Sequence, residues 1–228
     1  MSGLALLVVI YFSLGGPVQP APRLVDGFSS LKAFPYEPPE PGSYQLPALK
    51  TVPTGSLLNH ESVPVELDKL LRGRYSLVSF VYLNCSDAQG CPLAMSTLWQ
   101  LHSDSKKFPT LRNDLQLATI SFDPRRDTPA SLNMIVESMA QDRERKKKLD
   151  WHFLTGTSVE AIKPLLAGFG QAVGRNGDSV TINHLLRMFL VDRQGQIRNV
   201  YGLGSIDPRL IITDVQTLLI QEAQGRQQ

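Results

Sequence analysis

An apolar run of nine residues, 75–83 (YSLVSFVYL), constrains the fold more than any other segment of the chain. It is rich in Val, Phe and Tyr, and it has the length of a buried β-strand. A short loop follows, and Cys91-Pro92 then begins a helix that we predict to run through His102, because proline is favoured in the first turn of a helix. Cys91 is therefore expected at the N-cap of this helix, and a strand that leads directly into a helix favours an α/β fold.

Further strand and helix signals alternate along the rest of the chain. Strands are predicted at 115–122, 151–154, 185–191 and 196–201, and residues 192–195 make the last two a hairpin. Helices are predicted at 65–71, from Thr128-Pro129 to about Lys148, at 158–167 and at 208–221. One connecting loop is expected to contain Gly168, Gly170, Gly174 and Gly177. The alternation predicts an α/β fold with a mixed central sheet and flanking helices.

The N-terminal part of the chain has a different composition. Residues 4–14 (LALLVVIYFSL) have the length of a signal-peptide core and are short for a stable membrane span. Two features disagree with a cleaved signal peptide, since no Lys or Arg precedes the run and the cleavage pattern is poor. Residues 1–22 are therefore expected to be either a signal peptide or an N-terminal membrane anchor. Recurring prolines predict a linker at 23–53, which would hold the domain away from a membrane or lie along its surface. The folded domain is expected at 54–222, in the periplasm or another extracytoplasmic compartment.

Charge is nearly balanced, with 23 Lys and Arg against 21 Asp and Glu. Because nucleic-acid binding requires a strongly basic face, no nucleic-acid partner is expected. One basic run, residues 143–148 (RERKKK), is interpreted as the solvated end of a helix, with binding to anionic lipid or to an acidic partner as the alternative.

The chain has two cysteines, Cys85 and Cys91, on either side of the loop between the first strand and its helix. Two cysteines are too few for a usual structural zinc site. The positive end of a helix dipole is expected to lower the pKa of Cys91, and thiolates attack disulfides and bind Cu(I). An extended path between the cysteines would span about 20 Å, so the small residues at 86–90 must fold back for the thiols to meet. A working thiol pair, a structural disulfide and two unrelated thiols are the three alternatives.

Four segments carry a family resemblance, and they occur in order along the chain. They are residues 80–93 (FVYLNCSDAQGCPL), 121–132 (SFDPRRDTPASL), 151–156 (WHFLTG) and 182–202 (INHLLRMFLVDRQGQIRNVYG). Together they resemble the Sco/SenC family. The resemblance implies a thioredoxin-like fold and a location outside the cytoplasm.

The resemblance also implies a copper site made of Cys85, Cys91 and His184. In this family the protein delivers copper to the dinuclear centre of cytochrome oxidase or reduces its cysteines, so copper, as Cu(I) or Cu(II), is the expected cofactor. The expected partner is the copper-centre subunit of an oxidase or another exported thiol or copper protein. The family has three residues between its cysteines whereas this chain has five, so a thiol–disulfide oxidoreductase without tight copper binding and a non-catalytic module remain alternatives. Whether the chain is an enzyme is left undecided.

The other histidines, His60, His102 and His152, have no motif beside them and are interpreted as structural or exposed. Asp123 and Asp127 could suggest catalysis. Turn and cap chemistry is the plainer explanation, because Asp-Pro ends a strand and Thr-Pro begins a helix.

Overall fold

The computed structural model describes residues 23–29, 37–85, 87, 90–171, 173–175 and 182–225, with only the backbone at 175 and 182–184. The predicted signal or anchor segment, residues 1–22, lies outside this part of the chain. Within it, no helix is both long enough and apolar enough to span a bilayer.

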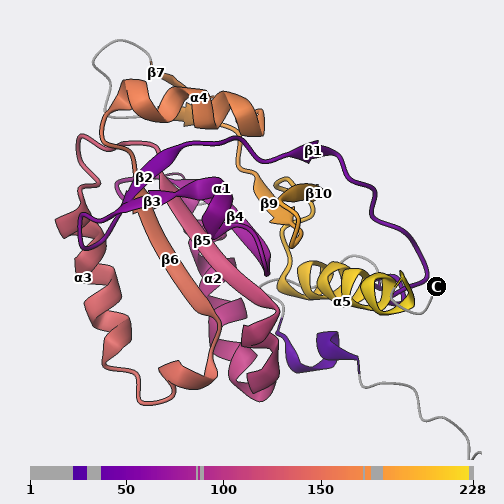
Figure 1. Ribbon diagram of the computed structural model, residues 1–228. Coiled ribbons are helices and arrows are strands. Elements are labelled where there is room, and N and C mark those ends of the chain that lie inside the picture. Colours follow the sequence, from indigo (N-terminus) through magenta and orange to yellow (C-terminus); the bar gives the residue numbers. More distant parts are fainter. Residues whose placement is uncertain are drawn as a thin grey trace, which may run out of the picture.

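In the described part of the chain, eight strands form one mixed sheet in the order β1-β10-β9-β4-β5-β6-β2-β3 (Figure 1). The parallel strands at its centre are β4 (Tyr75–Val81), β5 (Leu115–Ser121) and β6 (Asp150–Thr155). Antiparallel strands flank them: β9 (Met188–Val191), β10 (Gln196–Tyr201), β1 (Lys50–Thr51), β2 (Ser56–Asn59) and β3 (Pro64–Glu66). A separate pair consists of β7 (Val173–Arg175) and β8 (Ile182–His184).

Both faces of the sheet are covered by helices. Phe80 is in register with Ile120 and Leu154, and its ring lies 5.0 Å from the ring of Phe169 in α4 (Val159–Phe169). Side chains alternate along a strand, so Trp151 and Phe153 of β6 point to the opposite face. There they meet α2 (Cys91–Asp104) and α3 (Pro129–Ala140).

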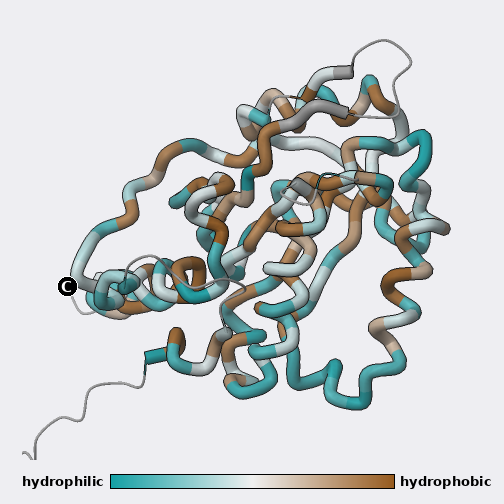
Figure 2. Tube along the Cα trace, turned by 180° about the vertical axis from the view of Figure 1, so that it is seen from behind, coloured by the Kyte–Doolittle hydropathy of each residue, from teal (hydrophilic) through white to brown (hydrophobic). Residues whose placement is uncertain are grey.

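The final helix α5 (Pro208–Gly225) packs beside α2, and the short α1 (Leu67–Leu70) follows β3. The brown segments of Figure 2 lie mainly along the central strands and the inner sides of the helices. This is the predicted α/β, thioredoxin-like arrangement.

Three predicted boundaries are wrong. The helix predicted from Thr128 to about Lys148 ends at Ala140, and a 3-10 turn, η4 (Arg145–Lys147), follows in a hydrophilic segment. Asp142 accepts a hydrogen bond from the backbone N–H of Glu144 and forms an ion pair with Lys148. The polar groups of this segment therefore have partners without a helix. The helix predicted at 65–71 begins only at Leu67, because Val65 pairs with β2. The strand predicted at 185–191 begins at Met188.

The predicted glycine loop is also wrong in part. Gly168 lies inside α4, and Gly170 has φ +68 and caps the C-terminus of that helix, where a left-handed conformation favours glycine. Gly174 belongs to β7, and Gly177 lies outside the described residues.

The described residues of the predicted linker lie along the domain. Leu46 and Val52 are buried, and the hydroxyl of Tyr44 donates a hydrogen bond to Asp214 in α5. Strand β1 pairs with β10, so the sheet begins before the predicted boundary at residue 54. Further upstream, Phe28 stacks on Phe108 at a ring distance of 5.8 Å.

Candidate functional site

Cys91 occupies the first turn of α2, directly after the loop that follows β4. Gly90 is the N-cap and Cys91 is the first helical residue, so the helix begins one residue earlier than predicted. Its side chain is 3% exposed, and its Sγ accepts a hydrogen bond from the backbone N–H of Tyr82 at 3.4 Å. The end of β4 and the start of α2 therefore hold this sulfur rigidly inside the protein.

Burial raises the pKa of the Cys91 thiol well above its ordinary value, so the lowering predicted from the helix dipole is wrong. The N–H of Tyr82 acts in the opposite direction, and the neighbouring Cys85 raises the pKa further. A helix N-terminus contributes about 0.3–1 kcal/mol to a charged group, whereas full burial can shift a pKa by about 3–5 units. Desolvation is the larger effect here, and in the metal-free protein Cys91 is a protonated thiol.

Cys85 is half-buried and hydrogen-bonds with Cys91. The loop turns back on itself, since the N–H of Gly90 donates to the carbonyl of Asp87 at 2.8 Å. Both cysteines are free thiols in this structure. The two thiols thus meet despite the five residues between them, with Cys85 on the accessible side.

His184, the third predicted ligand, is the last residue of β8 and pairs with Val173. Its side chain lies outside the described part of the structure. The next three residues, 185–187, share a hollow of about 360 Å³ with Asp87 and Gly90 of the cysteine loop. The fold therefore brings the chain beside His184 to the cysteine loop.

Two adjacent sulfur atoms are the soft donors that Cu(I) prefers, so the described donors fit copper. Among the side chains that the structure describes, no group of three or more His, Cys, Asp or Glu could hold a metal ion. A third ligand would have to come from a side chain outside that set, such as His184.

Asp127 supports this site in a way that the sequence interpretation missed. Its buried carboxylate accepts hydrogen bonds from the backbone N–H of Leu83 at 2.9 Å and from the hydroxyl of Ser121 at 2.6 Å. The prediction that Thr128-Pro129 begins a helix is confirmed, because Thr128 is the N-cap of α3 and accepts a hydrogen bond from the N–H of Ser131. Asp127 additionally ties the end of β5 to the start of the cysteine loop. Since β4 and β5 are parallel neighbours whose C-terminal ends share one edge, this contact could have been anticipated.

A family model for SCO1/SenC matches residues 47–220, which include all four of the segments that suggested the resemblance. The chain belongs to the SCO1/SenC family. The match runs from just before β1 into α5 and includes the cysteine loop and His184. No match is found among curated protein sequences.

Solved SCO1/SenC structures share this fold. The chain is similar to a SCO1/SenC family lipoprotein from Bacillus anthracis str. Ames, with a TM-score of 0.61, 24% identity and coverage of 75% of this chain and 95% of that one. It is similar to BsSco, with a TM-score of 0.58, 23% identity and coverage of 76% and 97%. It is also similar to copper-bound ScoI from Arabidopsis thaliana, with a TM-score of 0.55, 20% identity and coverage of 77% and 99%.

The remaining histidines lie together in a second hollow, away from the cysteine loop. His60, His102 and His152 all line it. His102 is 3% exposed, and burial lowers its pKa to about 4. It packs against Trp151 at a ring distance of 5.6 Å, which agrees with the structural role expected for it.

Proposed function

We propose that this SCO1/SenC protein carries Cu(I) on Cys85 and Cys91, with His184 as third ligand, for the copper centre of a respiratory cytochrome oxidase. The observation that carries the proposal is the contact between the two thiols at the β4–α2 turn. The similar ScoI structure has copper bound, and BsSco is described as a member of a family of cytochrome c oxidase assembly proteins. Copper is the cargo in this proposal, and the oxidase subunit is the acceptor.

The two cysteines have different roles in this proposal. Copper binding must displace the protons of both thiols, and the bound cation supplies the charge that holds them as thiolates. The N–H of Tyr82 then stabilises the negative charge on the sulfur of Cys91, which stays buried. Cys85 is the more accessible sulfur, so a thiol of the acceptor reaches the site from its side.

We place the protein outside the cytoplasm, held at the membrane through residues 1–22. Support comes from the apolar run at 4–14 and from the similarity to a lipoprotein of the same family. Anchoring leaves the domain free to meet a membrane-bound oxidase.

Thiol–disulfide exchange is the second candidate, and the same contact between the sulfurs favours it. The thiolate of Cys85 attacks a partner disulfide, and one partner sulfur leaves as a thiolate. Cys91 then attacks the mixed disulfide and releases the second partner thiol. The partner gains two electrons, and the protein ends with a Cys85–Cys91 disulfide.

Anaerobic Cu(I) titration of the fully reduced protein tests the copper proposal. We expect one Cu(I) per wild-type chain and loss of tight binding in Cys85→Ser, Cys91→Ser and His184→Ala. His60→Ala is the matched control and should bind copper normally, because His60 lines the other hollow. Absence of stoichiometric copper refutes the proposal. Exchange with a model disulfide that persists without copper would identify the second candidate, and a disulfide whose reduction only lowers stability would identify a structural staple.

A further inference from the structure

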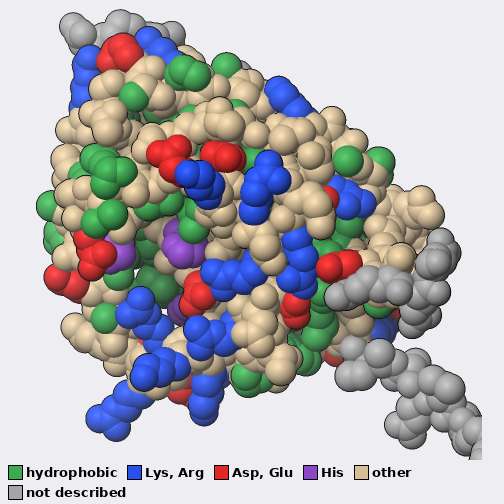
Figure 3. Space-filling model, viewed as in Figure 1, with side chains coloured by type: hydrophobic (Ala, Val, Ile, Leu, Met, Phe, Trp, Pro, Cys, Tyr) green, Lys and Arg blue, Asp and Glu red, His purple; other side chains and the backbone are tan. Residues whose placement is uncertain are grey.

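The second hollow is a separate pocket of about 180 Å³ between α2, α3, η4, β6 and the β2–β3 turn. It shares no lining residue with the hollow beside the cysteine loop. Figure 3 shows histidine side chains around a depression on this face, with Lys and Arg side chains gathered along one side of it. The pocket is therefore open to solvent, with basic side chains along one side of its rim and acidic side chains elsewhere around it.

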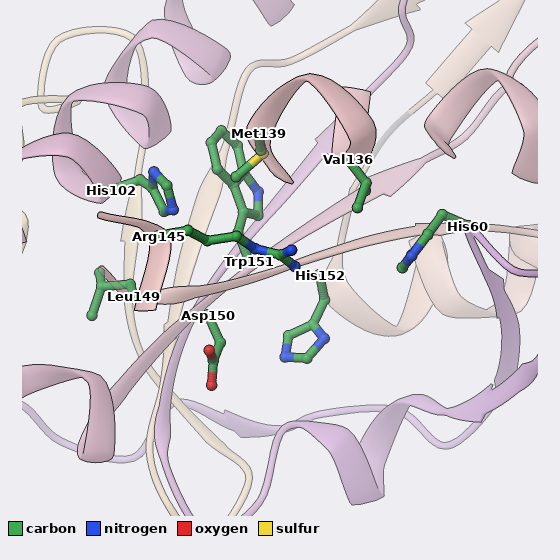
Figure 4. Close-up of a pocket in the computed structure, with 9 residues that line it drawn as sticks. All are labelled: His60, His102, Val136, Met139, Arg145, Leu149, Asp150, Trp151 and His152. Atoms are coloured by element: carbon green, nitrogen blue, oxygen red, sulfur yellow. The ribbon is translucent and has the colours of Figure 1, made fainter. Parts of the chain in front are cut away.

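Arg145 supplies an uncompensated charge to this pocket. Figure 4 shows its side chain extending across the pocket, with the guanidinium group on the side of His152 and His60. Among the described residues the Arg145 side chain has no hydrogen-bond or ion-pair partner, although it remains accessible to solvent. A guanidinium group carries five N–H donors in a planar fork that matches oxyanions.

The neighbouring charges do not neutralise Arg145. Asp150, on the wall of the pocket, forms ion pairs with Arg74 at 2.7 Å and with Arg112 at 3.2 Å. Lys148 is paired with Asp142. Among the described residues, the one carboxylate that lines the pocket is thus already paired with two arginines that do not line it, which leaves Arg145 without an ion-pair partner there.

The imidazole rings of His152 and His60 differ in the hydrogen-bonding groups that they present to the pocket. Gln116 donates from its Nε2 to Leu70 and Ser76, so its Oε1 is an acceptor and the Nε2 of His152, at 3.2 Å, must be the donor. Burial lowers the pKa of His152, so the ring is neutral, and its other nitrogen, Nδ1, can accept a hydrogen bond but cannot donate one to an anion. The His60 ring also faces the pocket (Figure 4).

Apolar side chains complete the walls. Val136, Met139, Leu149 and the Trp151 indole line the pocket, and a less polar wall strengthens an interaction between charges. Outside the pocket, Arg143, Lys146 and Lys147 are exposed members of the same basic run. Arg145 is also exposed, but it is the one member of the run 143–148 that lines the pocket.

We propose that this pocket binds a phosphate group through Arg145 and His60, from inorganic phosphate or from the headgroup of an anionic phospholipid. The size of the pocket suits a small oxyanion. The site does not depend on the copper proposal, because none of these residues belongs to the thiol site.

Titration of the reduced full-length protein with sodium phosphate, at an ionic strength held constant with sodium chloride, tests the site. Trp151 lines the pocket and Trp99 lies 5.0 Å from it, so tryptophan fluorescence is a direct readout, and the melting temperature is a second one. We expect saturable binding in the wild type and binding weakened about tenfold or more in Arg145→Gln, which removes a charge-assisted hydrogen bond. His60→Asn should also weaken it.

Arg143→Gln is the matched control, because it removes the same charge from an exposed position of the same run that does not line the pocket. It should bind phosphate like the wild type, and Arg145→Gln should still bind Cu(I) normally. No saturable response in the wild type, or equal losses in the two arginine variants, would overturn the proposal.

Co-sedimentation with phosphatidylcholine vesicles, with and without phosphatidylglycerol, separates the two sources. Arg145-dependent binding to the anionic vesicles that free phosphate competes away supports the lipid headgroup. Phosphate binding without vesicle binding supports the free ion. Vesicle binding that Arg143→Gln and Arg145→Gln reduce equally counts against a specific pocket, because it reflects the basic rim alone.

Discussion

Asp127→Ala should destabilise the protein and loosen the cysteine loop. The substitution removes the acceptor for the N–H of Leu83 and for the hydroxyl of Ser121. Each donor left without a partner costs about 1–3 kcal/mol when buried. Leu83 is 36% exposed, so water can partly replace its lost bond and the lower half of the range applies to it, whereas the full range applies to the buried Ser121. We expect a loss of about 2–5 kcal/mol in the free energy of unfolding, or roughly 5–20 °C in melting temperature.

Asp127→Asn should cost less, because both hydrogen bonds go to one carboxylate oxygen, Oδ2, whose place the amide oxygen can take. Burial raises the pKa of Asp127, so the wild-type carboxylate is charged at a cost that the asparagine avoids. We expect a loss of about 1 kcal/mol for this variant.

Urea unfolding of the reduced proteins measures these losses, and Arg125→Ala is the control. Arg125 is exposed in the same loop, so its substitution should change stability by less than about 0.5 kcal/mol. Iodoacetamide should also modify Cys91 faster in Asp127→Ala than in the wild type, because Leu83 lies two residues before Cys85. If Asp127→Ala unfolds like Arg125→Ala and leaves Cys91 protected, the carboxylate does not hold the loop.

Three further predictions test burial. In the metal-free native protein, iodoacetamide should modify Cys85 much faster than Cys91, because Cys91 is 3% exposed and burial raises its pKa; equal rates by mass spectrometry would contradict this. Because burial lowers the pKa of His102 from 6.5 to about 4, the unfolded chain takes up this proton first, so stability should fall between pH 6.5 and 4. The loss should be at most about 3 kcal/mol by urea unfolding, and His102→Gln should remove that part of the pH dependence. Gly168→Ala should destabilise by about 1–3 kcal/mol, although alanine favours helices, since its Cβ would lie 2.5 Å from Pro53; a gain in melting temperature would show that this segment does not pack on α4.

The elements that the sequence predicted well are those with strong local signals. Strand β4 is a long apolar run, and α2 begins beside a proline, so both are recognisable from contiguous residues. The short β2 and β3 have no such signal, since they become strands only by pairing with each other and, for β2, with β6. Helix α3 ends at Ala140, and the segment after it is held by an ion pair between Asp142 and Lys148, which helix propensity does not anticipate.

The loop between the two cysteines shows the same division. The sequence by itself determined the family, the fold class and the presence of two thiols at a strand-to-helix turn, because each depends on a motif or a local pattern. Only the tertiary structure decided that Cys91 is buried with a raised pKa and that His60 and His152 share a pocket with Arg145. The burial of Cys91 and the pairing of charges around Arg145 both depend on segments that are far apart in the chain. They are therefore determined only once the chain has folded.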